Sequence, residues 1–146
     1  MDIDLGEMLR DSRCISNRLH RRGSRALAEQ GVTDVQARVI LYLLKHADTG
    51  ASLTDVHREL HFSMAAASGL IKRLREKGYI RVEACALDER RKLLYVTEKG
   101  SRVREVLDST LKAIPDQLYR GFTEEEVATL HRLQKKMLRN LEQSET

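Results

Sequence analysis

The stretch from Phe62 to Thr97 limits the possible folds of this chain most, because it joins a helical pattern to two strand patterns. Ser63 is a preferred N-cap residue, and the apolar positions after it recur at helical spacing until Gly78, a residue type that commonly ends helices. Apolar and polar residues then alternate over residues 80–85, and a second apolar run covers residues 92–96. The segment is therefore expected to fold as a helix followed by a two-stranded hairpin.

The expected helix has two contrasting faces. At 100° per residue, one face gathers the apolar side chains Ala67, Leu70, Ile71 and Leu74, which indicates a core-facing side. The opposite face gathers small side chains and two cations: Ala65, Ser68, Gly69, Lys72 and Arg73. Small side chains let a helix approach a DNA major groove closely, with the cations near phosphate or guanine. An ordinary exposed helix is the alternative interpretation.

The expected hairpin has a charged tip, with the sequence Asp88-Glu89-Arg90-Arg91-Lys92. Arginine at such a tip can enter a minor groove, where narrow A·T-rich DNA has an enhanced negative potential. A helix with a small, basic face and a basic hairpin together indicate a winged helix-turn-helix, expected over residues 33–97. The predicted DNA contacts are Ser63, Ala65, Ser68, Gly69, Lys72, Arg73, Arg90 and Arg91.

The distribution of charge agrees with this location. The 146-residue chain carries a net charge of +4, and 41% of its residues are apolar, which suffices for the core of one domain. Between Arg58 and Lys92 there are nine Lys and Arg against five Asp and Glu, whereas residues 101–146 carry eight of each. No apolar run approaches membrane-span length, and the two cysteines form no CxxC pair, so we expect a cytoplasmic protein.

The residues before this segment indicate further helices. Apolar positions over residues 5–30 follow helical spacing, and this helix also carries six arginines, either as a solvated face or as a surface for a partner chain or an anion. A capping box opens a helix over residues 33–46. We expect a short strand at residues 51–53 and then a helix over residues 55–61, capped by Thr54.

The C-terminal residues indicate two more helices, opened by Thr97 and by Thr123. Pro115 inside the first of them predicts a kink or a break. These helices carry more apolar residues than a single chain can cover, so residues 1–32 and 98–146 are predicted to form a homodimer; a compact monomeric bundle is the alternative. The predicted fold class is mainly α with a small β-hairpin (α+β).

The sequence offers little support for catalysis. His57 and His61 are spaced i, i+4, which can bind a metal ion on a helix, but no glutamate between them is placed to act as a base. A surface pair beside DNA is the favoured interpretation. The chain also has no Gly-rich phosphate loop, serine elbow or paired carboxylates. We therefore predict no enzyme activity, no metal site and no cofactor.

The order of elements and the motifs K-G-Y-I, D-E-R-R and V-T-E-K-G resemble the MarR family of bacterial transcription regulators. In that family the wing carries an Asp-x-Arg motif nine residues before a helix-opening Thr, and Asp88, Arg90 and Thr97 fit this spacing. The resemblance implies a homodimer whose recognition helix is Ser63–Lys77 and whose wing arginine is Arg90. The Ala-Ala-Ala-Ser-Gly run from residue 65 departs from the family, which more often has Thr, Ser, Gln or Asn there.

The resemblance also implies a function: sequence-specific binding to a pseudo-palindromic site in double-stranded DNA, as a repressor released by a small phenolic or aromatic anion. The residues predicted to bind that ligand are Arg18, His20 and Tyr42. One alternative is a regulator that senses oxidants through Cys14, near which several arginines cluster. Another is a winged-helix module that binds an acidic protein partner.

Overall fold

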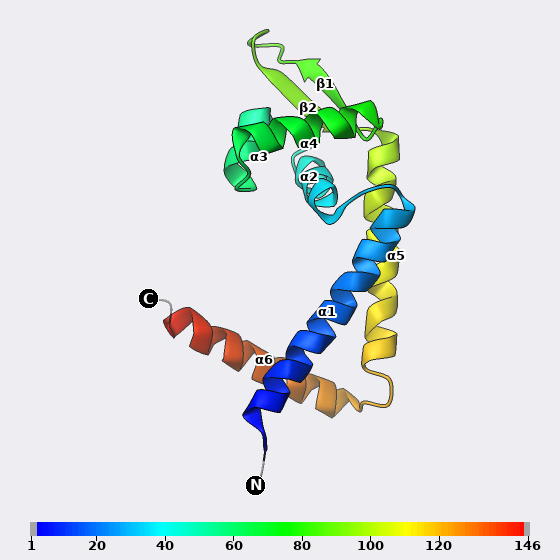
Figure 1. The fold of residues 1–146 in the computed structure, drawn as a ribbon, viewed down its shortest axis with the longest axis vertical. Helices are drawn as coiled ribbons and strands as arrows, with labels where there is room; N and C mark the ends of the chain where they lie inside the picture. The colour runs from blue at the N-terminus through cyan, green and yellow to red at the C-terminus, as the bar shows by residue number, and fades with distance from the viewer. Residues whose placement is uncertain (1–2, 145–146) are drawn as a thin grey trace. The chain divides into compact units, whose positions relative to one another are not determined.

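The computed structural model describes residues 3–144, which fold into six helices and one two-stranded antiparallel sheet (Figure 1). The elements in chain order are α1 (Leu5–Glu29), α2 (Asp34–Lys45), α3 (Leu53–Glu59), α4 (Met64–Glu76), β1 (Ile80–Ala84), β2 (Lys92–Val96), α5 (Glu98–Leu118) and α6 (Glu124–Ser144). The predicted fold class, mainly helical with a β-hairpin, is confirmed. The chain divides into two compact units, residues 1–111 and 112–146, which we describe separately.

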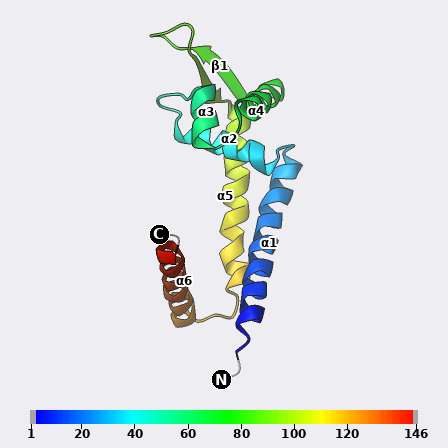
Figure 2. The same cartoon turned by 60° about the vertical axis from the view of Figure 1, so that its left-hand side comes forward.

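The core of the first unit lies where α2, α3, α4 and the hairpin meet. Its fully buried side chains, each less than 2% exposed, include Ile40 and Leu43 from α2, Val56 from α3 and Leu74 from α4. β1 pairs with β2 from Ile80↔Val96 to Ala84↔Lys92. In both views the hairpin loop projects away from the helices of this unit (Figures 1 and 2). The winged segment therefore has a buried core, to which Leu27 from α1 and Val103 from α5 also contribute.

The region before α3 corrects two expectations. Residues 51–53 do not form a strand, because only Ala51 pairs with the hairpin, through an isolated bridge to Leu94. The N-cap of α3 is Ser52 and not Thr54. Ser52 Oγ accepts from the Asp55 backbone N–H (3.2 Å), and the Asp55 carboxylate accepts from the Ser52 N–H (2.8 Å). This reciprocal capping box starts the helix at Leu53, two residues before the predicted start.

The end of α4 is joined to the end of α1. Gly78 adopts the expected left-handed conformation (φ 80°), which turns the chain towards β1. The buried Tyr79 then donates its hydroxyl hydrogen to the Gln30 carbonyl, and Lys77 Nζ donates to the Gly31 carbonyl at 3.0 Å. Both acceptors lie just after α1. The position of α4 is thus tied directly to the C-terminus of α1.

The C-terminal helices confirm their predicted caps but not a break. The Thr97 hydroxyl accepts from the Gly100 N–H at 3.3 Å, and Thr123 forms the expected capping box with Glu126. α5 continues through Pro115 to Leu118 without interruption. No residue of α6 is buried. None of the helices within residues 3–144 has the length and apolar content that a membrane span requires.

Candidate nucleic-acid interface

The outward face of α4 is formed by Ala65, Ser68, Gly69, Lys72 and Arg73, and we call it the reading face. All five residues are exposed, while Ala67, Ile71 and Leu74 on the opposite side are buried, as the helical spacing predicted. A Cβ built on Gly69 would meet nothing within 4 Å. The reading face is therefore smooth at its centre and open to solvent.

The N-terminus of α4 is capped as predicted. Ser63 Oγ accepts from the Ala66 backbone N–H at 3.1 Å, so this hydroxyl already serves the helix and remains exposed. The side chains of Lys72 and Arg73, further along the same helix, form no ion pair or hydrogen bond with any residue of the described range 3–144. Two unneutralised cations on a small-residue face favour a polyanionic partner.

The wing loop, residues 86–91 between β1 and β2, carries its own local bonds. Asp88 Oδ1 accepts from the Arg90 backbone N–H at 3.0 Å, and the Asp88 carbonyl accepts from the Arg91 N–H at 3.0 Å. These bonds shape the tip and leave the Arg90 side chain without a polar partner among residues 3–144. The Asp-x-Arg motif thus fixes the backbone at the position where its arginine projects.

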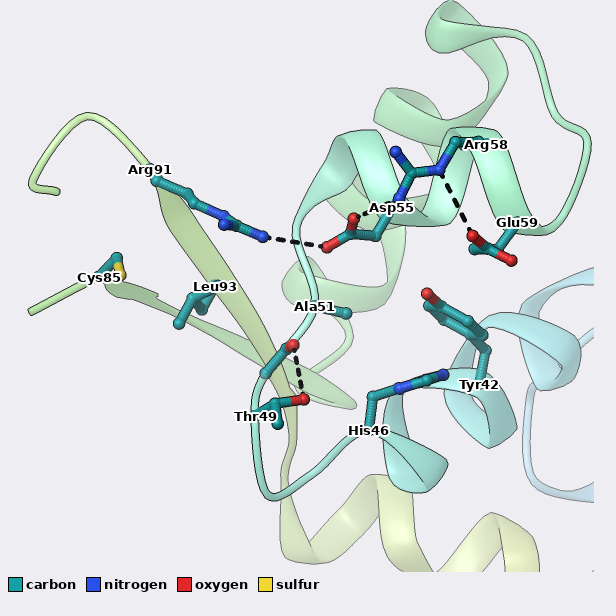
Figure 3. A pocket seen from close by; sticks show the side chains of 11 residues that line it. Tyr42, His46, Thr49, Ala51, Asp55, Arg58, Glu59, Cys85, Arg91 and Leu93 are labelled. Carbon is teal, nitrogen blue, oxygen red and sulfur yellow. Dashed lines mark hydrogen bonds and ion pairs between the residues drawn. The ribbon is translucent and has the colours of Figure 1, made fainter. Parts of the chain in front are cut away.

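Arg91 behaves differently from its neighbour. Its guanidinium NH2 lies 3.4 Å from Asp55 Oδ2 on α3 (Figure 3). Asp55 is also held by Ser52 and by Arg58, whose NH2 donates to Oδ1 at 3.1 Å. The backbone N–H of Ser52 first, and then its hydroxyl and the two arginines, keep the pKa of the Asp55 carboxyl below its usual 3.8, against the opposing effect of burial.

A cleft of about 640 Å³ separates α3 from the wing loop. One side is lined by Ser52, Leu53, Thr54, Asp55 and Arg58, and the other by Asp88, Arg90, Arg91 and Lys92. Ser52, Asp55 and Lys92 were not among the residues predicted to contact DNA. The S-x-x-D spacing of Ser52 and Asp55 was the available signal for the cap, but nothing in the sequence indicated the cross-element pair with Arg91.

The three residues predicted to bind a ligand lie at separate places in the protomer. Tyr42 lines a second cleft of about 540 Å³ with His46, Asp55 and Glu59 (Figure 3). Burial, followed by the Asp55 and Glu59 carboxylates, raises the pKa of the Tyr42 phenol above 10.0. His20 Nε2 instead lies 3.0 Å from Asp34 Oδ2.

Arg18, the third of these residues, faces a cleft along α1. That cleft is lined by Arg10, Arg13, Cys14, Asn17, Arg18 and Arg21. Cys14 is a free, exposed thiol among arginines of a single helix, whereas the second free cysteine, Cys85, is half-buried at the base of the wing. The two thiols thus lie in separate clefts.

The prediction that His57 and His61 form a surface pair is wrong. α3 ends at Glu59, so His57 and His61 do not lie on one helix, and His61 adopts φ 58° in the turn that follows. His57 Nδ1 lies 2.6 Å from the Phe62 carbonyl and donates to it. His57 is therefore half-buried and structural rather than half of a surface pair. Within residues 3–144 no group of three metal-binding side chains comes together.

A helix-turn-helix built on its own core, with an exposed basic helix face and a basic wing, defines a winged helix-turn-helix protein. Comparison with known proteins places it further. A sequence profile of the MarR family matches residues 30–91. The transcriptional activatory protein BadR of Rhodopseudomonas palustris is 32% identical over 123 residues, which make up 82% of this chain and 70% of BadR. The chain belongs to the MarR family of transcription regulators.

Solved structures agree with this assignment. MepR of Staphylococcus aureus in complex with DNA is similar over 88% of this chain and 96% of its own, with a TM-score of 0.79 and 26% sequence identity. MepR, a transcription regulator of the multidrug efflux pump MepA, aligns over 95% of this chain and 99% of its own, with a TM-score of 0.82 and 24% identity. BadR and MepR are both regulators of transcription.

Proposed function

We propose that this protein is a homodimer that binds double-stranded DNA sequence-specifically and regulates transcription from the bound site. The observation that carries the proposal is the pairing of the exposed reading face with the Arg90 tip on one winged segment. The similarity to MepR, whose structure is known in complex with DNA, supports it. In this proposal residues 33–97 read DNA, and residues 1–32 and 98–146 form the dimer.

The DNA contacts follow from shape and charge. Gly69, Ala65 and Ser68 let α4 enter a major groove closely, while Lys72 and Arg73 reach phosphate or a guanine edge. Ser63 lies at the N-terminus of the same helix, and helix N-termini commonly contact the phosphate backbone of DNA. Arg90 enters the neighbouring minor groove. Phosphate neutralisation then supplies most of the affinity, so binding weakens steeply with salt.

The dimer is supported by the exposed apolar residues of the terminal helices. Leu5 and Leu9 in α1 are 71% and 73% exposed, and Leu141 in α6 is 60% exposed. Exposed leucines at helical spacing mark a surface that buries against another chain. A two-fold dimer places two recognition helices about one DNA turn apart, which matches a pseudo-palindromic site.

The effector and the direction of regulation extend this proposal. A small phenolic or aromatic anion that prefers a dimer with the wrong half-site spacing would release DNA and relieve repression. The separate positions of Arg18, His20 and Tyr42 mean that these three residues bind such a ligand together only if the dimer unites them. Activation is the second candidate, because the relative BadR is named a transcriptional activatory protein.

The test is a binding titration with a duplex from the region flanking the gene, comparing wild type with Lys72→Ala and Arg90→Ala. Each variant should lose about tenfold or more in affinity, and each should reduce the slope of log affinity against log salt by about 1. Lys112→Ala, which removes an exposed cation of α5, is the matched control and should bind like wild type. Undiminished affinity in both test variants would refute the proposed reading surface.

Discrimination between DNA and a protein partner needs a second measurement. Wild type should bind random duplex DNA at low salt and sediment as a dimer. A monomer without DNA affinity at low salt would instead favour the protein-interaction module. Loss of DNA binding after peroxide treatment in wild type, but not in Cys14→Ser, would favour the redox alternative over ligand release.

A further inference from the structure

Asp55 connects three parts of the winged segment through one carboxylate. Its Oδ2 accepts from the Ser52 backbone N–H (2.8 Å) and the Ser52 hydroxyl (2.9 Å), and it also pairs with Arg91 NH2 at 3.4 Å. Its Oδ1 accepts from Arg58 NH2 at 3.1 Å. The bonds from Ser52 and Arg58 therefore hold this carboxylate in place independently of Arg91.

The link to Arg91 crosses from the wing loop to a helix. Figure 3 shows the Arg91 side chain extending from the end of the loop towards Asp55. Among the polar interactions that the described residues of the wing loop make, this ion pair is the one that reaches a helix. The bonds at Asp88 and the bond from the Cys85 N–H to the Arg91 carbonyl (2.8 Å) stay within the hairpin. The two strands also contact the helical body through the backbone bridge between Leu94 and Ala51 and through the buried side chains of Ile80 and Leu94.

Neighbouring arginines at the tip thus have different surroundings. Arg90 has only its backbone fixed, by Asp88, and its guanidinium is free of polar partners within residues 3–144. Arg91 has its guanidinium turned back to a side chain that is mostly buried, since the Asp55 side chain is 22% exposed. The Arg91 side chain is 54% exposed and keeps other N–H groups, but its pair with a fixed carboxylate limits where the guanidinium can point.

We infer that Arg91 is a positioning residue: its pair with Asp55 holds the wing loop against α3 so that Arg90 is presented to the minor groove. This inference rests on the proposed DNA-binding function, and it reassigns Arg91 from the predicted contacts to the support of Arg90. The position of the wing then depends on α3 as well as on α4. Asp55, which carries a negative charge next to the DNA-facing surface, raises affinity in this arrangement although its charge alone would lower it.

The alternative is that Arg91 leaves Asp55 and contacts a phosphate. The two arrangements predict opposite results for Asp55→Asn, which keeps an oxygen for the Ser52 cap and removes the charge. If Asp55 positions the wing, the variant binds more weakly. If Asp55 only competes with phosphate for Arg91, the variant binds more tightly, because a negative charge near the DNA is gone.

The experiment measures DNA affinity as a function of salt for Arg91→Ala, Arg91→Lys, Asp55→Asn, the double variant Asp55→Asn/Arg91→Ala and the matched control Arg90→Ala. Arg91→Ala and Asp55→Asn should each weaken binding about two- to fivefold, which is the range of a partly exposed ion pair. The double variant should be no weaker than either single variant. Arg91→Lys should restore most of the affinity.

The salt slope separates positioning from phosphate contact. Arg91→Ala should leave the slope as in wild type, whereas Arg90→Ala should lower it by about 1. A slope lowered equally in both variants, or tighter binding by Asp55→Asn, would overturn the inference. If wild type itself binds no DNA, the proposed function fails first, and the inference about Arg90 presentation fails with it.

Hydrogen exchange tests the link without DNA. Amides of residues 86–91 should exchange faster in Arg91→Ala and in Asp55→Asn, and to the same extent, while Arg90→Ala should exchange like wild type. If the wing-loop amides of Arg91→Ala exchange as slowly as those of wild type, the pair does not hold the loop, whatever the DNA affinity of the variant. Because Arg91→Ala leaves the Ser52 cap intact, this variant separates the link from the stability of α3.

Discussion

The winged segment and α6 contrast in how they use apolar residues. Leu74 in α4 is 0% exposed and lies in a core shared by three helices and a hairpin, whereas Leu138 in α6 is 52% exposed and no residue of α6 is buried. A helix with a wide apolar stripe and no buried side chain gains little free energy from folding by itself. The winged segment thus buries its apolar residues within this chain, whereas those of α6 stay exposed, as the proposed dimer requires.

α1 shares both properties. Its C-terminal end belongs to the reading part, because Leu27 is buried and Tyr79 and Lys77 bond to the carbonyls that follow the helix. Its N-terminal end exposes Leu5 and Leu9. If the N-terminal end of α1 contacts a second chain, as proposed, we expect a change there to reach α4 through this junction.

The largest expected effect is on the dimer. Replacing Leu138 and Leu141 with Lys removes two leucines that each contribute about 1.5–3 kcal/mol when buried. Sedimentation should then show a monomer, and affinity for the two-half-site duplex should fall about 100-fold or more. Arg139→Ala, between the two positions, should remain dimeric. A double variant that still sediments like wild type would contradict the claim that the leucines of α6 are buried against a second chain.

A core substitution in the winged segment should lower the free energy of unfolding by the same amount whether or not the protein is dimeric. Leu74→Ala leaves a cavity in a fully buried site and should cost about 2–5 kcal/mol of the free energy of unfolding. Urea titration should show this loss at every protein concentration, while the loss in the α6 double variant should depend on concentration. A concentration-dependent loss in Leu74→Ala would mean that the winged segment does not fold by itself.

A smaller effect is expected at the junction between the hairpin and α5. A Cβ on Gly100 would overlap the Tyr79 carbonyl oxygen and Val96 Cγ1, so Gly100→Ala should cost about 1–3 kcal/mol through overpacking. Gly69→Ala is the matched control, since nothing lies near its Cβ, and it should stabilise α4 by about 0.5–1 kcal/mol. Equal thermal stability of the two variants would contradict the packing described for Gly100.

The smallest effect concerns acid. The pKa of Asp55 is lowered in the folded protein, so its carboxylate stabilises the fold above the usual 3.8, and that contribution is lost as the pH falls below this value. The difference in unfolding free energy between wild type and Asp55→Asn should therefore be constant from pH 7 to about 5 and shrink towards pH 3. A difference of the same size at pH 3 and pH 6 would show that the charge of Asp55 is not involved.

Local patterns predicted most of the fold. The N-caps Thr33, Ser63 and Thr97 and the left-handed Gly78 depend on bonds to near neighbours, and each lies where the sequence placed it. The start of α3 was wrong because two polar residues, Ser52 and Thr54, could cap it, and the choice depends on the carboxylate of Asp55. Pro115 was expected to kink or break α5, and α5 continues through it without a break.

The candidate site was predictable only in part, for the same reason. The two faces of α4 follow from a 100° repeat, so the reading face could be read from residue spacing alone. The pair between Arg91 and Asp55 joins residues 36 positions apart, and no periodicity links them. Adjacent arginines at one tip cannot be told apart by sequence, because their roles depend on which side chain the loop turns towards the helix.

The most direct test of the central claim, that the smooth face of α4 enters the DNA, is the affinity of Gly69→Leu for the specific duplex. The added side chain meets no protein atom within 4 Å of its Cβ, so the fold should be unaffected. We predict a loss of about tenfold or more in specific affinity, with Gly69→Ala remaining close to wild type. If Gly69→Leu folds normally and binds as tightly as wild type, α4 does not read DNA through this face.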